Sequence, residues 1–231
     1  MNAKLAVVTG ASSGIGAATA RALLDDGWEV IIGARRTHLL EQIPAQAHYL
    51  DVTDDASVAE FASHVQRCDL LVNNAGGALG LDSIADANLA DWQTMYDTNV
   101  LGTLRVTRAL LPALQAAQGL IVNISSVAGL YPYAGGSGYN AAKFGVTALN
   151  KVMRIEFAEH DLRITEINPG RVHTDFSTVR FKGDEQKAAA VYADKLNLTA
   201  ADIAEAIRWV AAQPPHVNID RMIITPRDQV F

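Results

Sequence analysis

The chain has 231 residues, 49% hydrophobic and 19% charged, a balance typical of a compact globular protein and not of a disordered one. We expect one domain over residues 1–231. The net charge of −6 and the lack of a basic stripe argue against nucleic-acid binding. The longest apolar runs are far shorter than the roughly 18 residues of a membrane span, so no membrane association is expected.

Apolar runs of strand length alternate with amphipathic segments of helix length. The opening "MNAKLAVVTG" leads directly into the first expected strand, which predicts no signal peptide and a cytoplasmic location. The expected strands cover residues 5–10, 29–34, 48–52, 69–74, 120–126, 163–170 and 221–225. The expected helices lie near residues 14–26, 55–66, 89–115, 141–159 and 200–212. Strands that are apolar throughout are covered on both faces, so the alternation predicts an α/β fold with a doubly wound parallel sheet.

Four features along the chain narrow the prediction further. Thr199, followed by Asp202, forms a capping signal before the last helix. Residues 171–198 are polar and longer than an ordinary connection, which is typical of a lid over a site. Cys68 is the only cysteine and opens a buried strand, so it is interpreted as a packed thiol and not as a nucleophile. The six histidines have no metal-ligand spacing, and no metal is expected.

The first expected strand runs into "TGASSGIG", where Gly10, Gly14 and Gly16 open a helix. Glycines let the backbone turn tightly and approach a pyrophosphate, which the free N–H groups of the helix N-terminus then bind. A tight turn without a ligand is the alternative. The position of this glycine-rich stretch between strand one and helix one favours dinucleotide binding.

The end of the second expected strand distinguishes the two nicotinamide cofactors. NAD requires an acid there, about 20 residues after the turn, to bind the ribose hydroxyls. This chain has Arg35 and Arg36 instead, and the next acid is Glu41. Guanidinium groups suit a 2′-phosphate. Although both arginines could be ordinary surface residues, the pattern predicts NADP.

The stretch "SSVAGLYPYAGGSGYNAAK" contains three tyrosines and one lysine. Tyr139 precedes Lys143 by four residues at the start of an expected helix, so the two side chains share a face. A fixed ammonium nearby lowers the pKa of a tyrosine, which is about 10 in free form. Tyr131 and Tyr133 have no such cation, and we expect them to line the substrate mouth.

Four motifs occur in order: the turn spaced TGxxxGxG, "NNAG" (73–76), "SSVAG" (125–129) and "YNAAK" (139–143). Together they resemble the short-chain dehydrogenase/reductase family over essentially the whole chain. The resemblance implies a Rossmann-type fold and an oxidoreductase with Tyr139 as the proton-transferring group. It further implies that Ser126 holds the substrate oxygen and that Lys143 also binds the nicotinamide ribose.

Asn99 matches the family's helix asparagine, which holds a water that links Lys143 to solvent. Without the resemblance, an asparagine in a helix is a cap or a local hydrogen-bonding group. Arg171 departs from the small or apolar residues common at its position, and its role stays open. The resemblance and the cofactor motifs assign the following residues to NADP: Gly10, Ser12, Ser13, Gly14, Ile15, Gly16, Arg35, Arg36, Asp51, Val52, Asn74, Ala75, Gly76, Tyr139, Lys143, Pro169, Gly170, Val172 and Thr174.

Residues 176–188 and 214–226 resemble the branch of NADP-dependent 3-hydroxy acid dehydrogenases, including serine and allo-threonine dehydrogenases, which form homotetramers. The branch implies a small hydroxy acid or alcohol as substrate. A general NADPH-dependent carbonyl or aldehyde reductase is the alternative. A second alternative is an NADP-sensing protein without turnover, against which the intact Ser126, Tyr139 and Lys143 speak.

The sequence "TVRFKGD" brings two cations into the expected lid. Arg180 has a guanidinium that matches a carboxylate with two parallel hydrogen bonds, so it is predicted to anchor a substrate carboxylate. Lys182 is the weaker choice, because an ammonium cannot form that bidentate pair. In the alternative, both residues pair with Asp184 or Glu185 on the surface of the lid.

Overall fold

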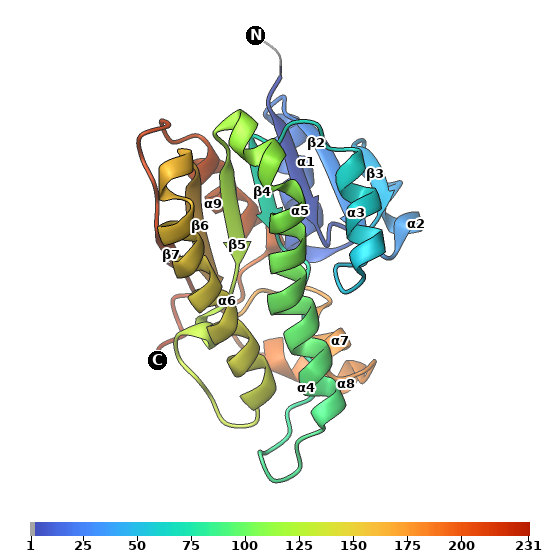
Figure 1. The fold of residues 1–231 in the computed structure, drawn as a ribbon. Coiled ribbons are helices and arrows are strands. Elements are labelled where there is room, and N and C mark those ends of the chain that lie inside the picture. The colour runs from blue at the N-terminus through green and yellow to red at the C-terminus, as the bar shows by residue number, and fades with distance from the viewer. Residues whose placement is uncertain (1–2) are drawn as a thin grey trace.

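The computed structural model describes residues 3–231, which form a seven-stranded, all-parallel sheet in the order β3-β2-β1-β4-β5-β6-β7 (Figure 1). The strands are β1 (Leu5–Thr9), β2 (Glu29–Ala34), β3 (Gln46–Tyr49), β4 (Leu70–Asn73), β5 (Leu120–Ile124), β6 (Arg163–Pro169) and β7 (Arg221–Ile224). The predicted doubly wound parallel α/β sheet is therefore confirmed.

Helices cover both faces of this sheet (Figure 1). The α-helices are α1 (Gly14–Asp25), α2 (Thr37–Leu40), α3 (Asp55–Ser63), α4 (Leu89–Tyr96), α5 (Gly102–Ala117), α6 (Ser137–Glu156), α7 (Phe176–Arg180), α8 (Glu185–Tyr192) and α9 (Ala200–Ala211). Helix α9 packs against α1, and α3, α5 and α6 cover the opposite face. The predicted cap of α9 is present as a complete capping box between Thr199 and Asp202.

Side chains alternate along each strand, so that they contribute to two separate hydrophobic cores, one on each face of the sheet. In β1, Ala6 and Val8 pack toward α1 and α9, whereas Val7 packs toward α3 and α5. All three residues are fully buried. A strand that is buried on both faces has no solvent-facing positions, which explains the continuous apolar runs in the sequence.

The strand expected at residues 48–52 lies earlier, at Gln46–Tyr49, and its pattern is mostly exposed. It forms the edge of the sheet and pairs with β2 only. Asp51 ends it: its carboxylate accepts hydrogen bonds from the backbone N–H and the hydroxyl of Thr53, at 3.0 and 2.7 Å. This local turn takes the backbone away from the sheet.

The helix expected as one piece at residues 89–115 is interrupted by a π-helical turn at Asp97–Leu101. Asn99 lies in this turn, and its amide donates to the carbonyl oxygens of Gly77 and Met95 at 2.9 and 2.7 Å. Wide turns of this kind are frequent at functional sites. The interruption points the Asn99 side chain at the segment that follows β4.

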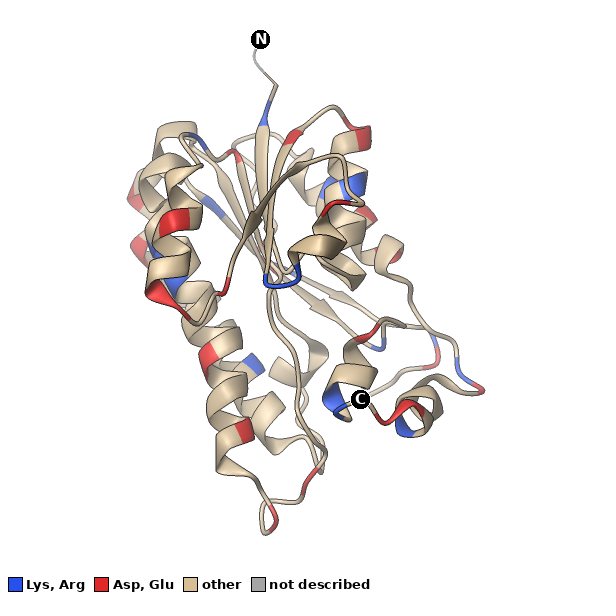
Figure 2. Cartoon of the chain, turned by 90° about the vertical axis from the view of Figure 1, so that its right-hand side faces the viewer, with Lys and Arg blue, Asp and Glu red and all other residues tan. Residues whose placement is uncertain are grey.

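Residues 171–198 contain α7 and α8, and a bridge between Val172 and Leu198 joins the two ends of the segment. Both helices lie beyond the carboxyl ends of the central strands (Figure 1). Acidic and basic residues are interspersed along the outer helices (Figure 2). No described helix has the length and apolar character needed to cross a membrane.

Candidate active site

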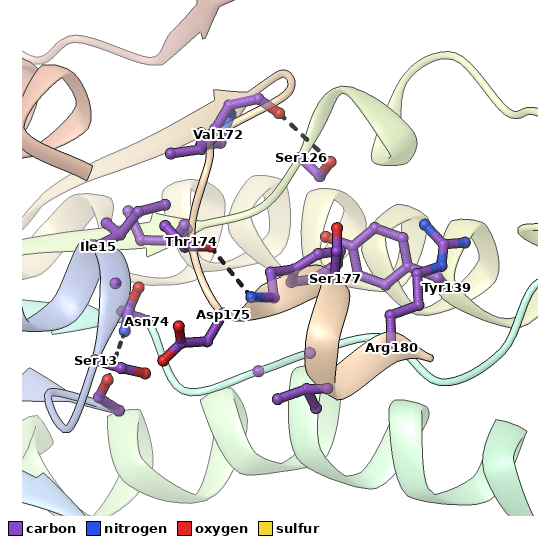
Figure 3. A pocket seen from close by; sticks show the side chains of 18 of the residues that line it. Ser13, Ile15, Asn74, Ser126, Tyr139, Val172, Thr174, Asp175, Ser177 and Arg180 are labelled. Atoms are coloured by element: carbon purple, nitrogen blue, oxygen red, sulfur yellow. Dashed lines mark hydrogen bonds between the residues drawn. The ribbon is translucent and has the colours of Figure 1, made fainter. Parts of the chain in front are cut away.

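A cavity of about 770 Å³ lies at the carboxyl edge of the sheet, where ligands bind in open α/β folds (Figure 3). Most of the residues predicted for cofactor or substrate line it. From that set, the lining comprises Gly10, Ser12, Ser13, Gly14, Ile15, Arg35, Arg36, Asp51, Val52, Asn74, Ala75, Gly76, Ser126, Tyr133, Tyr139, Lys143, Pro169, Gly170, Val172, Thr174 and Arg180. Gly16, Asn99 and Tyr131 lie outside this lining.

The turn between β1 and α1 requires its glycines for different reasons. Gly10 and Gly14 have φ angles of 66° and 54°, in the left-handed region that other residues rarely adopt. A Cβ on Gly16 would come within 2.6 Å of the Gly10 carbonyl oxygen, so this glycine is set by close packing. The Ser13 side chain makes no capping bond at the N-terminus of α1. The first turn of α1 therefore presents backbone N–H groups to an anion.

The two arginines after β2 differ in their surroundings. Arg36 donates through Nη2 to the hydroxyl oxygens of Ser12 and Ser13, at 3.1 and 2.9 Å, which fixes it against the glycine-rich turn. Arg35 is exposed and lies close enough to Asp51 to affect its titration. Burial raises the pKa of Asp51. The hydrogen bonds from Thr53 and the charge of Arg35 lower it by more, so the net pKa lies below the usual value of an aspartate.

Asn74 ties the ends of β1 and β4 together. Its amide donates to the Thr9 carbonyl oxygen at 3.0 Å, and its backbone N–H donates to the Thr9 hydroxyl at 3.0 Å. Two residues later, a Cβ on Gly76 would lie 2.5 Å from Oδ1 of Asn99 and 3.6 Å from Nζ of Lys143. The side chains of Asn99 and Lys143 thus both lie close to the backbone of Gly76.

Tyr139 and Ser126 face each other across the cavity, one on α6 and the other directly after β5 (Figure 3). Burial raises the pKa of Tyr139 well above its usual range, and nearby Tyr133 adds to this effect. A hydrogen bond with the Ser126 side chain and the charge of Arg180 act in the opposite direction. The sequence predicted a pKa lowered by Lys143; in the structure the net shift is upward, and the groups that oppose it are Ser126 and Arg180.

Lys143 is buried one helical turn after Tyr139, and its ammonium lies 5.8 Å from the centre of the tyrosine ring. Nζ donates to the carbonyl oxygen of Ile124 at 2.9 Å. Burial lowers the pKa of Lys143 to about 8, and the negative charge of Glu166 opposes this shift. Near neutral pH the ammonium form therefore predominates.

Arg180, at the end of α7, is 9% exposed and lies between two tyrosines. Its guanidinium carbon is 5.4 Å from the ring centre of Tyr133 and 5.7 Å from that of Tyr139. Figure 3 shows Arg180 beside Tyr139. Nε donates to the Gly80 carbonyl oxygen at 3.0 Å. Nη2 is buried and has no hydrogen-bond partner within residues 3–231. Asp184 pairs instead with Lys187 at 3.1 Å, and no ion pair joins Arg180 to Asp184 or Glu185 within residues 3–231.

Comparison with known proteins gives a consistent result. Residues 4–185 match the family model described as short chain dehydrogenase. The chain belongs to this family. It is 55% identical over 231 residues to an uncharacterized oxidoreductase of Mycobacterium tuberculosis (strain CDC 1551 / Oshkosh), covering 98% of this chain and 92% of the relative.

Two further proteins resemble the chain over nearly its whole length. One is an NADP-dependent 3-hydroxy acid dehydrogenase of Salmonella typhi, 40% identical, with 98% of this chain and 96% of the relative covered. The other is a closed form of serine dehydrogenase complexed with NADP+, whose structure matches with a TM-score of 0.95. It is 38% identical and covers 98% of this chain and 96% of that one. The predicted family and the predicted oxidoreductase class are confirmed.

Two expectations about this short-chain dehydrogenase differ from the structure. Tyr131, expected at the substrate mouth, instead stacks on Phe231 with ring centres 4.5 Å apart. Lys182, expected as the weaker choice for a substrate carboxylate, pairs with Asp91 at 2.7 Å, and so does not follow the alternative of pairing with an acid of its own segment. The sequence also missed Phe176, whose ring meets that of Tyr139 edge-on at 5.4 Å. No local pattern marks Phe176, because its contact is made between α6 and α7.

Arg171, whose role the sequence left open, connects three segments. Its guanidinium donates to the Asn197 side chain at 2.9 Å, to the Leu196 carbonyl oxygen at 2.6 Å and to both carboxylate oxygens of Asp228 at 2.9 Å. Its backbone N–H donates to the Gln229 side chain at 2.7 Å. Arg171 therefore fixes both ends of residues 171–198 against residues 228–229. Gln229, which also lines the cavity, was not identified from the sequence.

Arg171→Ala should loosen residues 171–198 without unfolding the sheet, because it removes bonds at the two ends of this segment only. We expect limited proteolysis to cut between residues 181 and 198 several-fold faster than in the wild type. Arg154→Ala, which removes an exposed ion pair with Asp220, is the matched control. Cleavage of Arg171→Ala at the wild-type rate would contradict this role.

Proposed function

We propose that the chain is an NADP-dependent oxidoreductase that transfers a hydride between the nicotinamide and a small 3-hydroxy acid. The observation that carries this proposal is Arg180, a buried guanidinium beside Tyr139 whose Nη2 lacks a partner among the described residues. A buried polar group without a partner costs stability, and a substrate carboxylate would satisfy it. The relatives named as 3-hydroxy acid dehydrogenase and serine dehydrogenase support the same substrate class.

The residues of the cavity fit a phosphorylated dinucleotide. The glycine-rich turn offers backbone N–H groups to a pyrophosphate, and Gly76 leaves the groove open beside Lys143. Arg35 and Arg36 line the same cavity after β2, where an acid would favour NAD. NADP as cofactor agrees with the name of the Salmonella relative and with the NADP+ complex of serine dehydrogenase.

In this proposal each residue has a distinct role. When bound, the nicotinamide supplies or accepts the hydride at the carbon that bears the substrate oxygen. Ser126 holds this oxygen, and Tyr139 donates a proton to it in reduction or removes one in oxidation. The raised pKa of Tyr139 favours the protonated form of its hydroxyl, the form that donates in reduction. Lys143 holds the nicotinamide ribose, and Asn99 links Lys143 to solvent through a water.

Apolar side chains in the same cavity favour a second substrate class. Val127, Phe176 and Leu81 line it together with Arg180. An apolar wall beside Tyr139 suits neutral aldehydes and ketones, so a general NADPH-dependent carbonyl reductase is the second candidate. The two candidates share all chemistry at Ser126 and Tyr139 and differ only in the use of Arg180.

We further propose a homotetramer in the cytoplasm. Leu104 on α5 and Phe144 on α6 are exposed on one face, and Trp209 on α9 and Ile223 on β7 are exposed elsewhere. Large apolar side chains that gather on a surface are typical of interfaces. Two distinct apolar faces suit a tetramer with two kinds of twofold contact.

Tyr139→Phe should lower kcat by at least about 10²-fold, the lower end of general acid–base contributions, because it removes the proton-transferring hydroxyl. Binding of NADPH, measured by fluorescence titration, should stay close to that of the wild type. Tyr131→Phe removes a hydroxyl outside the cavity and serves as the control. Near-normal turnover of purified Tyr139→Phe would show that another group moves the proton.

Arg35→Ala should weaken NADPH binding by roughly 1.5–3 kcal/mol, the size of a charge-assisted hydrogen bond. NADH should be affected little, because it lacks the 2′-phosphate. Fluorescence titration of both cofactors measures the difference. The control Arg21→Ala removes an arginine that bonds the Gln42 carbonyl oxygen, away from the cavity. Equal losses of affinity for the two cofactors would show that Arg35 does not bind the 2′-phosphate and is an ordinary surface residue.

Arg180→Ala should reduce kcat/KM for 3-hydroxy acids by about 10²-fold, the size of a lost hydrogen-bonded charge pair. Alcohols and aldehydes of similar size should change little, since they offer no carboxylate. Arg180→Lys should restore only part of the activity, because it loses the bidentate geometry. Lys182→Ala is the control, as its ammonium pairs with Asp91. An equal loss of kcat/KM on charged and neutral substrates would show that Arg180 only shapes the cavity and does not bind a carboxylate.

A further inference from the structure

A buried carboxylate lies behind the active site, outside the cavity lining. Glu166 is in the middle of β6 and has no exposed surface. Oε2 accepts a hydrogen bond from Nε of Arg221 on β7 at 2.7 Å, and Oε1 accepts one from the hydroxyl of Thr147 on α6. A buried charge is costly unless it is paired, and an apolar residue of similar volume is often at least as stabilising. Stability alone therefore does not account for this residue.

One connection leads from Glu166 to the proposed catalytic serine. Asn168 is two residues further along β6, so its side chain lies on the same face of the strand. In the orientation that satisfies its amide, Asn168 donates to the carbonyl oxygen of Ser126 at 2.9 Å and to Oε1 of Glu166 at 3.3 Å. The amide thus joins the carboxylate to the backbone that presents the Ser126 hydroxyl.

The other connection leads to helix α6. Thr147 follows Lys143 by four residues, on the same face of the helix. The Ser125 hydroxyl, next to Ser126, donates to the backbone carbonyl oxygen of Lys143 at 3.3 Å. Glu166 therefore contacts α6 one turn beyond Lys143, close to where the end of β5 meets the same helix.

We propose that Glu166 is a positioning residue. It holds Ser126 through Asn168 and helix α6 through Thr147, and so fixes the position of Ser126 relative to Tyr139 and Lys143. This inference rests on the proposed function, because it presumes that these three side chains act together on one substrate oxygen. Proton and hydride transfer depend on the relative positions of the reacting groups: a displacement of 1 Å can cost about 10²-fold in rate. The negative charge of Glu166 also favours the ammonium form of Lys143.

The first test is Glu166→Gln, which keeps the shape of the side chain and removes its charge. We expect kcat to fall at least about tenfold for a 3-hydroxy acid and for a neutral aldehyde alike, because both use Ser126 and Tyr139. The dissociation constant of NADPH and the KM values should stay within about twofold, since Glu166 lies outside the lining of the cavity. A wild-type kcat in folded Glu166→Gln would overturn the proposal.

A second pair of variants keeps the proposal testable if Glu166→Gln does not fold. Thr147→Val removes the hydroxyl that reaches Glu166 and should lower kcat, whereas Thr147→Ser retains it and should restore kcat. Thr165→Val is the matched control. Thr165 is fully buried in β6, the strand that carries Glu166, but its hydroxyl donates to the Ile219 carbonyl oxygen, away from the site. We expect it to lower the melting temperature without a specific loss of kcat.

The outcomes separate the two proposals. A low kcat in both Tyr139→Phe and Glu166→Gln supports both. A low kcat in Tyr139→Phe, with wild-type values in Glu166→Gln and Thr147→Val, overturns the positioning role alone. Full turnover of Tyr139→Phe overturns the proposed function and, with it, the role of Glu166. Equal losses of kcat in Thr147→Val and Thr165→Val would assign both to general stability and would also overturn the positioning role.

Discussion

All seven strands of the sheet run in the same direction, so their carboxyl ends meet at one edge. Helices bury both faces, which leaves this edge as the place where backbone and polar side chains remain available to a ligand. The edge is closed by bonds between neighbouring strand ends, such as those from Asn74 to Thr9. The glycine-rich turn, Ser126 and Asn74 therefore come together although they lie far apart in the sequence. The chemistry of the site depends on this common direction.

Burial is the second constraint, and it acts on the two titratable groups in opposite directions. It raises the pKa of Tyr139 and lowers that of Lys143, because a low-dielectric environment disfavours both phenolate and ammonium. Each group has a partner that counters the effect. Ser126 and Arg180 favour the phenolate, and Glu166 favours the ammonium. The electrostatics of the site thus depend on residues of β6 and α7 as well as on the helix that carries Tyr139.

Local patterns in the sequence predict the strands, the phosphate turn and the Tyr139–Lys143 pair, because each depends on residues close together in the chain. The edge strand was predicted too late in the chain and the π-helical turn at Asn99 was missed, since an Asx turn and a contact with Gly77 override the local pattern. Tyr131 could not be placed, because its position depends on stacking against Phe231, 100 residues later. The partners of the Arg171 and Glu166 side chains in other segments lie 19 to 57 residues away along the chain, and one sequence contains no signal for them.

The contrast between Arg171 and Arg180 bears on how the segment 171–198 works. Both guanidiniums are largely buried, but among residues 3–231 Arg171 finds acceptors on three residues, whereas Arg180 has one, the Gly80 carbonyl oxygen. The backbone N–H of Gly80 in turn donates to the Arg180 carbonyl oxygen at 2.9 Å. An anion bound by Arg180 would therefore strengthen a link between this segment and the loop after β4.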